Sequence, residues 1–233
     1  MQEIFDVNYN NYVDIIGTAH FTRRSIHDAY YYIESLKPKD VAIELDWRRF
    51  IHLSTACLHC PRRGSCKDIC EFTGATEALG NVDANIWLID MTEQEMRERM
   101  ESRTKLFERT HISYPTSVNE YEDPVWLWEH GFKDRVVENS RRQIEAHRRI
   151  FPSVWQVLID ERNALMAARL AWIATKNLNE EKRSKILSFV GAGHVEGIRS
   201  LLGNPIRIRE DLKNFDLSFT EPTLIRRVAV QLN

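Results

Sequence analysis

Long hydrophobic runs are missing from this 233-residue sequence, although 43% of its residues are apolar. No stretch approaches the roughly 18 consecutive apolar residues that a membrane-spanning helix needs. The first six residues, MQEIFD, contain neither a basic segment nor an apolar core, so we expect no secretory signal peptide. Together these absences predict a cytoplasmic protein that does not insert directly into a membrane.

An excess of charge of one sign is also missing, because 32 Lys and Arg residues face 34 Asp and Glu residues and the net charge is −2. The two signs are interspersed, so the sequence offers no basic surface for nucleic acid or for an anionic membrane. Only nine glycines occur, and no linker rich in Gly and Ser divides the chain. The composition therefore favours a single globular domain over residues 1–233.

Several common catalytic signatures are absent. The chain has no HExxH motif, and Ser25 and Ser153 lack the glycines of a nucleophile elbow. In the segment 191–197 the third glycine comes one position too late for a dinucleotide-binding fingerprint. These absences argue against a serine hydrolase and a nucleotide-dependent oxidoreductase.

Cysteine is confined to one short segment, in which the spacing is C-x2-C-x5-C-x3-C; its members are Cys57, Cys60, Cys66 and Cys70. Four thiols this close together suit one structural zinc ion or an iron–sulfur cluster. Two disulfides, for which four cysteines allow three connectivities, are one alternative, and free thiols are another. In each case we expect residues 55–80 to form a small cysteine-containing insertion outside the main sheet.

Short β-branched or aromatic runs alternate with amphipathic stretches along the chain. We expect strands at residues 12–16, 41–45, 85–89 and 186–190, and helices at about 24–36, from 47, 92–109, 125–150, 152–178 and 195–202. This order predicts an α/β fold with a mainly parallel central sheet flanked by helices. Residues 110–180 are then expected to form a helical layer or lid.

Polar residues follow the carboxyl end of each expected strand. Two of the strands run into the same GxxH pattern, which delivers His20 and His194, while a third is followed by Glu44. Because parallel strands bring their carboxyl ends to one edge, these side chains are expected to converge. Asp46 and Asp90 occupy similar positions, although they could equally cap helices and pair with nearby arginines.

Four segments carry a resemblance to a known family: GTAHFTRRS at 17–25, KPKDVAIELDWR at 37–48, DERNALMA at 160–167 and VGAGHVEGI at 190–198. With these motifs the chain strongly resembles the TraB/PrgY family. It departs from the family pattern at Asn163, where Asp is usual, and at Met91-Thr92, where an Arg-Asp pair is usual.

The resemblance implies kinship with Tiki-type proteases, erythromycin-esterase-like enzymes and ChaN proteins, and for TraB/PrgY proteins a role in shutting down peptide pheromone signalling. In the Tiki proteins the paired GxxH motifs are held to serve a metal-dependent peptidase. Transferred residue by residue, the pattern nominates six positions in this chain: His20, Glu44, Arg48, Glu161, Arg162 and His194.

These positions support a specific hypothesis, a metal-dependent hydrolase of the peptidase or esterase type. His20 and His194 would bind a divalent ion (Mn, Co or Zn), and Glu44 would complete the coordination or act as the base. Arg48 or Arg162 would neutralise a developing oxyanion or hold a substrate carboxylate, with Glu161 a further catalytic candidate.

Two alternatives remain at this point. In one, the same cleft binds a peptide or small ligand and turns nothing over, as a regulator of the pheromone-shutdown type would. In the other, the histidines are hydrogen-bonded structural groups and the carboxylate–arginine pairs belong to the scaffold. The substrate is expected to be a peptide or a small molecule, and the oligomeric state, a homo-oligomer included, is open.

Overall fold

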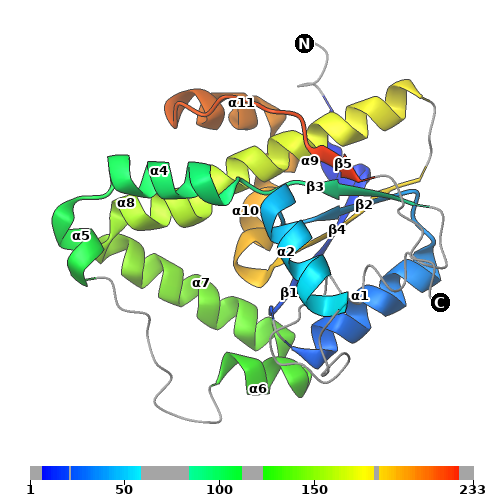
Figure 1. The fold of residues 1–233 in the computed structure, drawn as a ribbon, viewed down its shortest axis with the longest axis horizontal. Helices are drawn as coiled ribbons and strands as arrows, with labels where there is room; N and C mark the ends of the chain where they lie inside the picture. The colour runs from blue at the N-terminus through cyan, green and yellow to red at the C-terminus, as the bar shows by residue number, and fades with distance from the viewer. Residues whose placement is uncertain (1–6, 21, 59–83, 112–122, 181–183, 226–233) are drawn as a thin grey trace.

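The computed structural model describes residues 7–20, 22–58, 84–111, 123–180 and 184–225 (Figure 1). At its centre lies a five-stranded sheet in the order β1-β4-β2-β3-β5. Its strands are β1 (Val13–Thr18), β2 (Asp40–Ile43), β3 (Asn85–Leu88), β4 (Ile186–Gly191) and β5 (Thr223–Ile225). Only β5 is antiparallel to its neighbour, so the expected α/β fold with a mainly parallel sheet is confirmed.

Helices flank this sheet and connect its strands. In the amino-terminal half they are η2 (Tyr9–Asn11), α1 (Arg23–Leu36), α2 (Trp47–Leu58), α4 (Glu93–Arg103) and α5 (Leu106–His111). In the carboxyl-terminal half they are α6 (Pro124–Glu129), α7 (Lys133–Ile150), α8 (Pro152–Trp155), η4 (Gln156–Glu161), α9 (Arg162–Asn179), α10 (Ala192–Gly203) and α11 (Pro205–Asn214). No helix in the described ranges is both long and apolar enough to cross a bilayer.

The register of the sheet sets the position of the strand ends. β4 lies between β1 and β2, with Thr18 opposite Gly191 and Ile43 opposite Phe189. The pairing continues one residue past β2, because the Glu44 amide donates to the Phe189 carbonyl at 3.2 Å. The residues after β1, β2 and β4 are therefore neighbours at one edge of the sheet.

Each face of the sheet is buried under its own helices. On one face, Val41 and Ile43 pack with Ala29 and Ile33 of α1, and α2 adds Phe50. On the other face, α9, α10 and α11 cover a second apolar cluster that includes Ala42. Neighbouring residues of β2 thus point to opposite layers, as the period of two in a strand requires. Burial on both faces also explains why the strands are apolar throughout instead of alternating.

Two helices expected from the sequence are interrupted. The charged stretch at 92–109 stops after Arg103, and α5 begins three residues later. The stretch at 125–150 divides into α6 and α7 at Gly131, whose φ of 91° lies in the left-handed region that glycine tolerates best. α6 and α7 pack against Ala19 and Ala192, beside the strand ends.

The third long helix contains a π-helical segment. α8 continues through η4, which is π-helical over Gln156–Glu161, directly into α9. A π turn accommodates one extra residue within a helix and often occurs at functional positions. Here it places Arg162 and Asn163 at the start of the buried helix α9.

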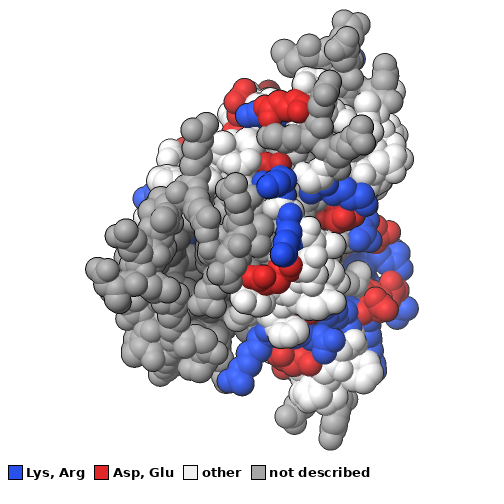
Figure 2. Space-filling model, turned by 90° about the vertical axis from the view of Figure 1, so that its right-hand side faces the viewer, with Lys and Arg blue, Asp and Glu red and all other residues white. Residues whose placement is uncertain are grey.

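Two further predictions concern the cysteine segment and the distribution of surface charge. Cys60, Cys66 and Cys70 lie outside the described residues, and only the backbone of Cys57 is described, at the end of α2. Figure 2 shows Lys, Arg, Asp and Glu side chains next to one another over the described part of one face, in keeping with the interspersed charges of the sequence.

Candidate functional site

The loop that carries His20 is fixed by buried hydroxyl groups. Thr22 caps α1, since its side chain accepts a hydrogen bond from the Ser25 amide at 3.2 Å. The hydroxyls of Thr22 and Ser25 both donate to the Ala19 carbonyl, at 2.8 and 3.1 Å. Glu129 of α6 accepts from the amide of Arg23 at 2.5 Å. The TRRS sequence therefore holds the turn after β1 in a defined conformation beside α6.

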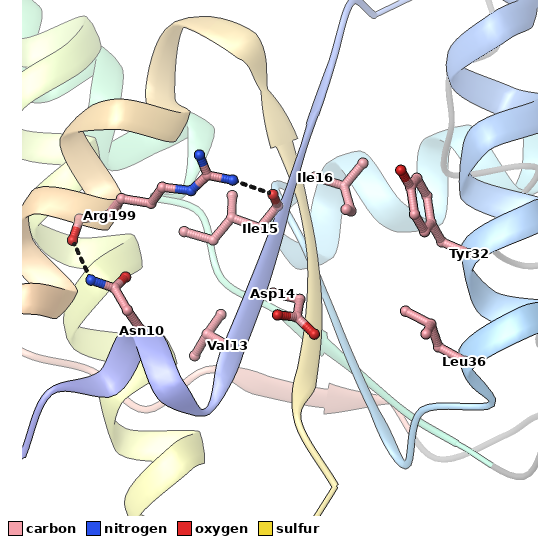
Figure 3. A pocket seen from close by; sticks show the side chains of 8 residues that line it. All are labelled: Asn10, Val13, Asp14, Ile15, Ile16, Tyr32, Leu36 and Arg199. Atoms are coloured by element: carbon pink, nitrogen blue, oxygen red, sulfur yellow. Dashed lines mark hydrogen bonds between the residues drawn. The ribbon is translucent and has the colours of Figure 1, made fainter.

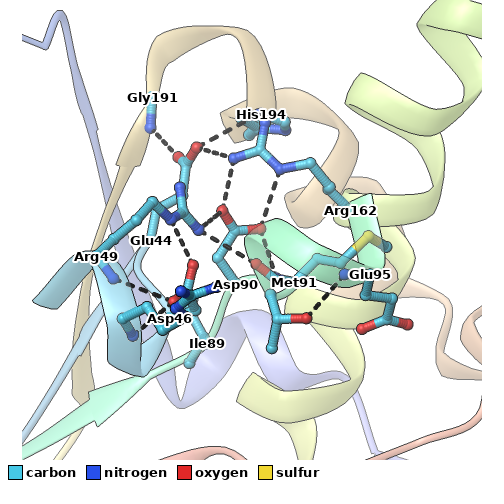
Figure 4. Close-up of polar contacts among 12 residues, drawn as sticks. Glu44, Asp46, Arg49, Ile89, Asp90, Met91, Glu95, Arg162, Gly191 and His194 are labelled. Atoms are coloured by element: carbon cyan, nitrogen blue, oxygen red, sulfur yellow. Dashed lines mark hydrogen bonds and ion pairs between the residues drawn. The ribbon is translucent and has the colours of Figure 1, made fainter. Parts of the chain in front are cut away.

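Glu44 lies at the centre of the strand ends and is 4% exposed. Its Oε2 accepts a hydrogen bond of 2.6 Å from the Gly191 amide at the end of β4. Its Oε1 accepts one from Nη2 of Arg162, which reaches it from α9 (Figure 4). Both carboxylate oxygens are thus engaged by groups that favour the charged form.

His194 does not lie on a loop after β4 but in the first turn of α10, where it is buried. Its Nδ1 is 2.7 Å from Oδ1 of Asn163, and its Nε2 is 3.0 Å from Nη1 of Arg162. An amide oxygen accepts and a guanidinium only donates, so Nδ1 carries the proton and Nε2 accepts. Burial lowers the pKa of His194 despite the nearby charge of Glu44, and the ring is therefore neutral at neutral pH.

Arg162 connects this group to a second buried carboxylate. Its Nε and Nη2 donate to Asp90 at 3.0 and 2.7 Å, which makes a bidentate pair. Arg49 reaches the same carboxylate with Nη2 at 2.6 Å and binds Asp46 through Nε at 2.6 Å. Asp46 also accepts from the Arg48 amide at 2.7 Å, so it caps α2. Of the alternative raised from the sequence, Asp46 both caps α2 and pairs with an arginine, whereas Asp90 pairs with two arginines and caps no helix, since Thr92 caps α4.

Arginine partners keep the buried carboxylates of this cluster ionised. Burial acts to raise the pKa of Glu44, but the interactions of its carboxylate with His194 and Arg162 outweigh burial and lower the pKa below its usual range. Burial is likewise outweighed at Asp90, where Arg162 and Arg49 hold the pKa far below its ordinary value. Because His194 is neutral, the guanidinium of Arg162 is the cation that keeps Glu44 ionised.

The two GxxH histidines meet at Glu44. Nε2 of His20 lies 3.9 Å and Nε2 of His194 lies 3.6 Å from Oε1 of Glu44. The two ring nitrogens are therefore no further apart than the sum of these distances, whereas two nitrogens bonded to one zinc ion lie within about 4.2 Å of each other. A methyl group on Gly191 would come within 2.9 Å of Nε2 of His20, which explains the glycine at this position.

The donor atoms at this point suit a divalent ion in kind but are not arranged around one. Two imidazoles and a carboxylate are ordinary ligands for Zn, Mn or Co. Within the described ranges, however, no group of three or more His, Cys, Asp or Glu side chains is positioned to hold a metal ion. The reason is visible at His194 and Glu44, since Arg162 donates to both of the atoms that a metal would need.

Two of the nominated residues lie elsewhere. Arg48 is exposed in the first turn of α2, and the arginine that enters the cluster from that helix is Arg49. Glu161 is fully buried, but its carboxylate accepts from Arg99 at 3.1 Å and lies 3.3 Å from Arg103. These contacts join η4 to α4, and neither arginine donates to Glu44. Neither Arg48 nor Glu161 lies in the cluster around Glu44: the Arg48 amide donates to Asp46, which caps α2, and the Glu161 carboxylate pairs with α4. The catalytic role expected of both stays a prediction.

Sequence reasoning missed three residues that complete the cluster. Arg49 follows Asp46 at the i,i+3 spacing of a helix, a signal that the adjacent Arg48 masks. Asn163 sits next to Arg162 and was noted only as a departure from a family pattern. Arg169 lies two turns further along α9 and donates to the Ile89 carbonyl at 3.1 Å, which supports the chain at Asp90.

Among the described residues, one hollow lies along β1 and another borders Asn163. The larger, of about 390 Å³, runs along β1, with Tyr32 and Leu36 of α1 on one side and Asn10 and Arg199 on the other (Figure 3). Arg199 donates to the Ile15 carbonyl at 3.1 Å there. The smaller, of about 200 Å³, is lined by Asn163 among other residues and so lies behind His194.

Comparison with known proteins gives one family and one relative. A model described as the TraB/PrgY/gumN family matches residues 75–204, a span that contains Arg162 and His194 and begins after Glu44. A protein of Methanocaldococcus jannaschii described as uncharacterized is 30% identical over 232 residues, which cover 85% of this chain and 56% of the relative. The chain thus spans little more than half of that relative's length. No solved structure matches.

Proposed function

The chain belongs to the TraB/PrgY/gumN family, and on that premise we propose that it is a metal-dependent hydrolase of an amide or ester bond. The observation that supports this proposal is the convergence of His20 and His194 on one oxygen of Glu44, at 3.9 and 3.6 Å. Three different strand ends supply these groups, as they do in many α/β active sites. His20, Glu44 and His194 are the residues that would hold the ion.

Each side chain has a defined task in this proposal. Hydrogen bonding to Asn163 keeps the proton of His194 on Nδ1, so that Nε2 faces the site with its lone pair. The lowered pKa of Glu44 keeps its carboxylate ionised and so available to coordinate the ion, although it also makes the group a weaker base. A bound Mn, Co or Zn ion would supply Lewis acidity, which lowers the pKa of a water molecule and polarises a carbonyl. Arg162 brings a fixed positive charge to the place where negative charge develops during hydrolysis.

The direction of approach follows from exposure. The side chain of His20 is 36% exposed, whereas those of Glu44 and His194 are 4% and 7% exposed. A substrate would therefore reach the cluster from the side of His20, past Ala19 and α6. The reacting group must be a carbonyl at an accessible position, as in a peptide bond or the ester of a small molecule. Within the family resemblance, we propose a peptide as the first substrate to test.

A second candidate function is peptide binding without turnover. The hollow along β1 favours it, because β1 is an edge strand of the sheet and runs beside exposed Leu36 of α1. An extended peptide recognises an edge strand through backbone hydrogen bonds and places alternate side chains in pockets. A regulator that captures a peptide in this way would not need the Glu44 cluster for binding.

One experiment distinguishes the two functions. The protein is stripped with chelator, reloaded separately with Mn, Co or Zn, and screened against peptide and ester libraries by mass spectrometry. Glu44→Gln should abolish turnover because it removes the charge and nearly keeps the size. The matched control is Glu108→Gln, which alters a buried carboxylate that accepts from the amides of Lys105 and Ser153, outside the cluster.

The hydrolase is supported if cleavage requires metal, disappears in Glu44→Gln and persists in Glu108→Gln. It is overturned if no ion permits cleavage of any library member. Retention of a peptide with equal affinity in the wild type and in Glu44→Gln would then favour the binding function.

A further inference from the structure

Arg162 donates to the two buried atoms that a metal ion would need. Its Nη1 lies 3.0 Å from Nε2 of His194, and its Nη2 donates to Oε1 of Glu44. A carboxylate oxygen has more than one lone pair, but the neutral imidazole has a single accepting nitrogen with a single lone pair. His194 therefore either accepts from Arg162 or coordinates a metal, and the two states exclude each other.

Charge reinforces this exclusion. The guanidinium is 12% exposed, so water screens it poorly. A divalent ion bound to Glu44 and His194 would lie against this fixed positive charge. Arg49, which shares Asp90 with Arg162, adds a second positive charge to the same group. Each carboxylate of the cluster thus already accepts from Arg49 or Arg162, so an incoming cation meets no carboxylate without an arginine partner.

Arg162 also has other hydrogen-bond acceptors, which it would keep after releasing Glu44 and His194. Its pair with Asp90 uses Nε and Nη2, at 3.0 and 2.7 Å. Its Nη1 also donates to the Leu158 carbonyl in the π-helical segment, at 3.2 Å. Loss of the bonds to His194 and Glu44 would therefore leave every nitrogen of the guanidinium with a hydrogen-bond acceptor.

We propose that Arg162 is an internal cation that competes with the divalent ion for Glu44 and His194. Metal loading then requires Arg162 to withdraw onto Asp90 and Leu158, while exposed His20 receives the ion first. This inference rests on the proposed metal-dependent function and adds its regulation. The site is closed by its own arginine until an ion displaces that arginine.

The test measures Mn(II) affinity in the full chain after removal of metal by chelator. Mn(II) is chosen because thiolates bind it poorly, so the segment around Cys57 contributes little. Free Mn(II) is followed by electron paramagnetic resonance, and only binding that His20→Ala removes is counted. Arg162→Met deletes both the charge and the donors, and it should bind Mn(II) at least about tenfold more tightly than the wild type.

Two further variants serve as a substitute for Arg162→Met and as a control for the affinity measurement. Arg162→Gln keeps an amide donor without the charge, so it serves if Arg162→Met fails to fold, and it should also bind more tightly. Arg97→Met is the matched control, because Arg97 forms an exposed pair with Glu93 on α4, and its affinity should equal that of the wild type. Thermal unfolding gives an independent readout. Mn(II) should raise the melting temperature of the Arg162 variants more than that of the wild type, since it replaces the lost cation.

Equal Mn(II) affinity in the wild type and both Arg162 variants would overturn the inference and leave the metal site intact. Weaker binding in those variants would overturn it too, and would make Arg162 a support for the ion. If none of the three proteins binds Mn(II) in a manner that depends on His20, the proposed metal site fails and the competition fails with it.

Discussion

Asn163 and His194 form a hydrogen bond of 2.7 Å between the amide Oδ1 and the ring Nδ1. Because the amide oxygen carries no charge, this bond orients the imidazole without stabilising its protonated form. Asn163 comes from α9 and His194 from α10, two helices that cover the same face of the sheet. The protonation state at the strand ends is therefore controlled from the helical layer.

Replacing Asn163 by Asp should raise the pKa of His194. A carboxylate at this distance favours the imidazolium, and opposite charges within about 4–6 Å shift a pKa by roughly one to three units. NMR titration of the imidazole carbon resonances, with His194→Gln used for assignment, gives the value directly. Asn204→Asp, an exposed change after α10, is the control and should leave the titration unaltered. An unchanged His194 titration in Asn163→Asp would contradict the arrangement.

The stability of the protein should fall on acidification below about pH 6.5, the ordinary pKa of histidine, and His194 should account for part of that fall. Burial lowers the pKa of His194 in the folded state. Below pH 6.5 the His194 ring therefore binds a proton in the unfolded chain but not in the folded protein, and acid favours unfolding. Urea unfolding between pH 7.5 and 5 should show a shallower dependence in His194→Gln. Parallel curves for the two proteins would refute the assignment.

Gly191→Ala should disturb the site without unfolding the protein. The φ of Gly191 is −54°, which any residue adopts, so the glycine is required by space and not by backbone conformation. The added methyl would lie 2.9 Å from Nε2 of His20 and 3.4 Å from Oε2 of Glu44. We expect Mn(II) affinity to drop about tenfold or more because misplacing one ligand weakens a site strongly.

Gly193→Ala is the matched control two residues away. Its methyl would meet only Cδ1 of Ile144, at 3.4 Å, and a flexible side-chain end gives way easily. Equal effects of the two substitutions on affinity would show that the contact with His20 is not what restricts residue 191.

Glu161→Gln should lower stability and spare the cluster. The carboxylate is fully buried beside Arg99 and Arg103, so removing its charge takes one anion from both arginines, of which Arg99 keeps only the longer pair with Glu95 at 3.6 Å. Breaking a buried pair of this kind costs about 3 kcal/mol. Chemical denaturation measures the loss, and Mn(II) affinity should match the wild type. Arg48→Ala, at an exposed position, should change the free energy of unfolding by less than about 0.5 kcal/mol. A loss of affinity in Glu161→Gln at unchanged stability would restore its expected catalytic role.

The sheet could be predicted because its strands are short apolar runs that end at recognisable positions. Val41-Ala42-Ile43 and the two GxxH segments fall at the carboxyl ends of β2, β1 and β4, and the topology brings them together. Two elements near the end of the chain were not predicted. β5 has only three residues, Thr223–Ile225, too few to show an alternation, whereas α11 is as amphipathic as α9 and its periodicity could have been recognised.

The sequence predicted the candidate metal ligands of the site, but it did not predict which arginines pair with its carboxylates. His20, Glu44 and His194 follow strands, so their convergence is a consequence of strand order. Arg49 and Arg162 come from helices, and which arginine of the 48–49 pair turns inward depends on where α2 begins. A one-residue difference in helix start rotates a side chain by about 100°, which is finer than sequence patterns resolve.

The π-helical segment Gln156–Glu161 makes the cluster sensitive to chain length in a way that substitutions do not reveal. An extra residue is stored in that turn, and deleting one residue there would let α8 and α9 join as an ordinary α-helix. Everything beyond the deletion would then turn by about 100° relative to what precedes it. Because α9 is anchored in the core, the rotation would fall on α8 and α7, and α7 would lose its packing against Ala192. Insertion and deletion, more than point substitution, would then be the route by which relatives could reshape the entrance to these strand ends.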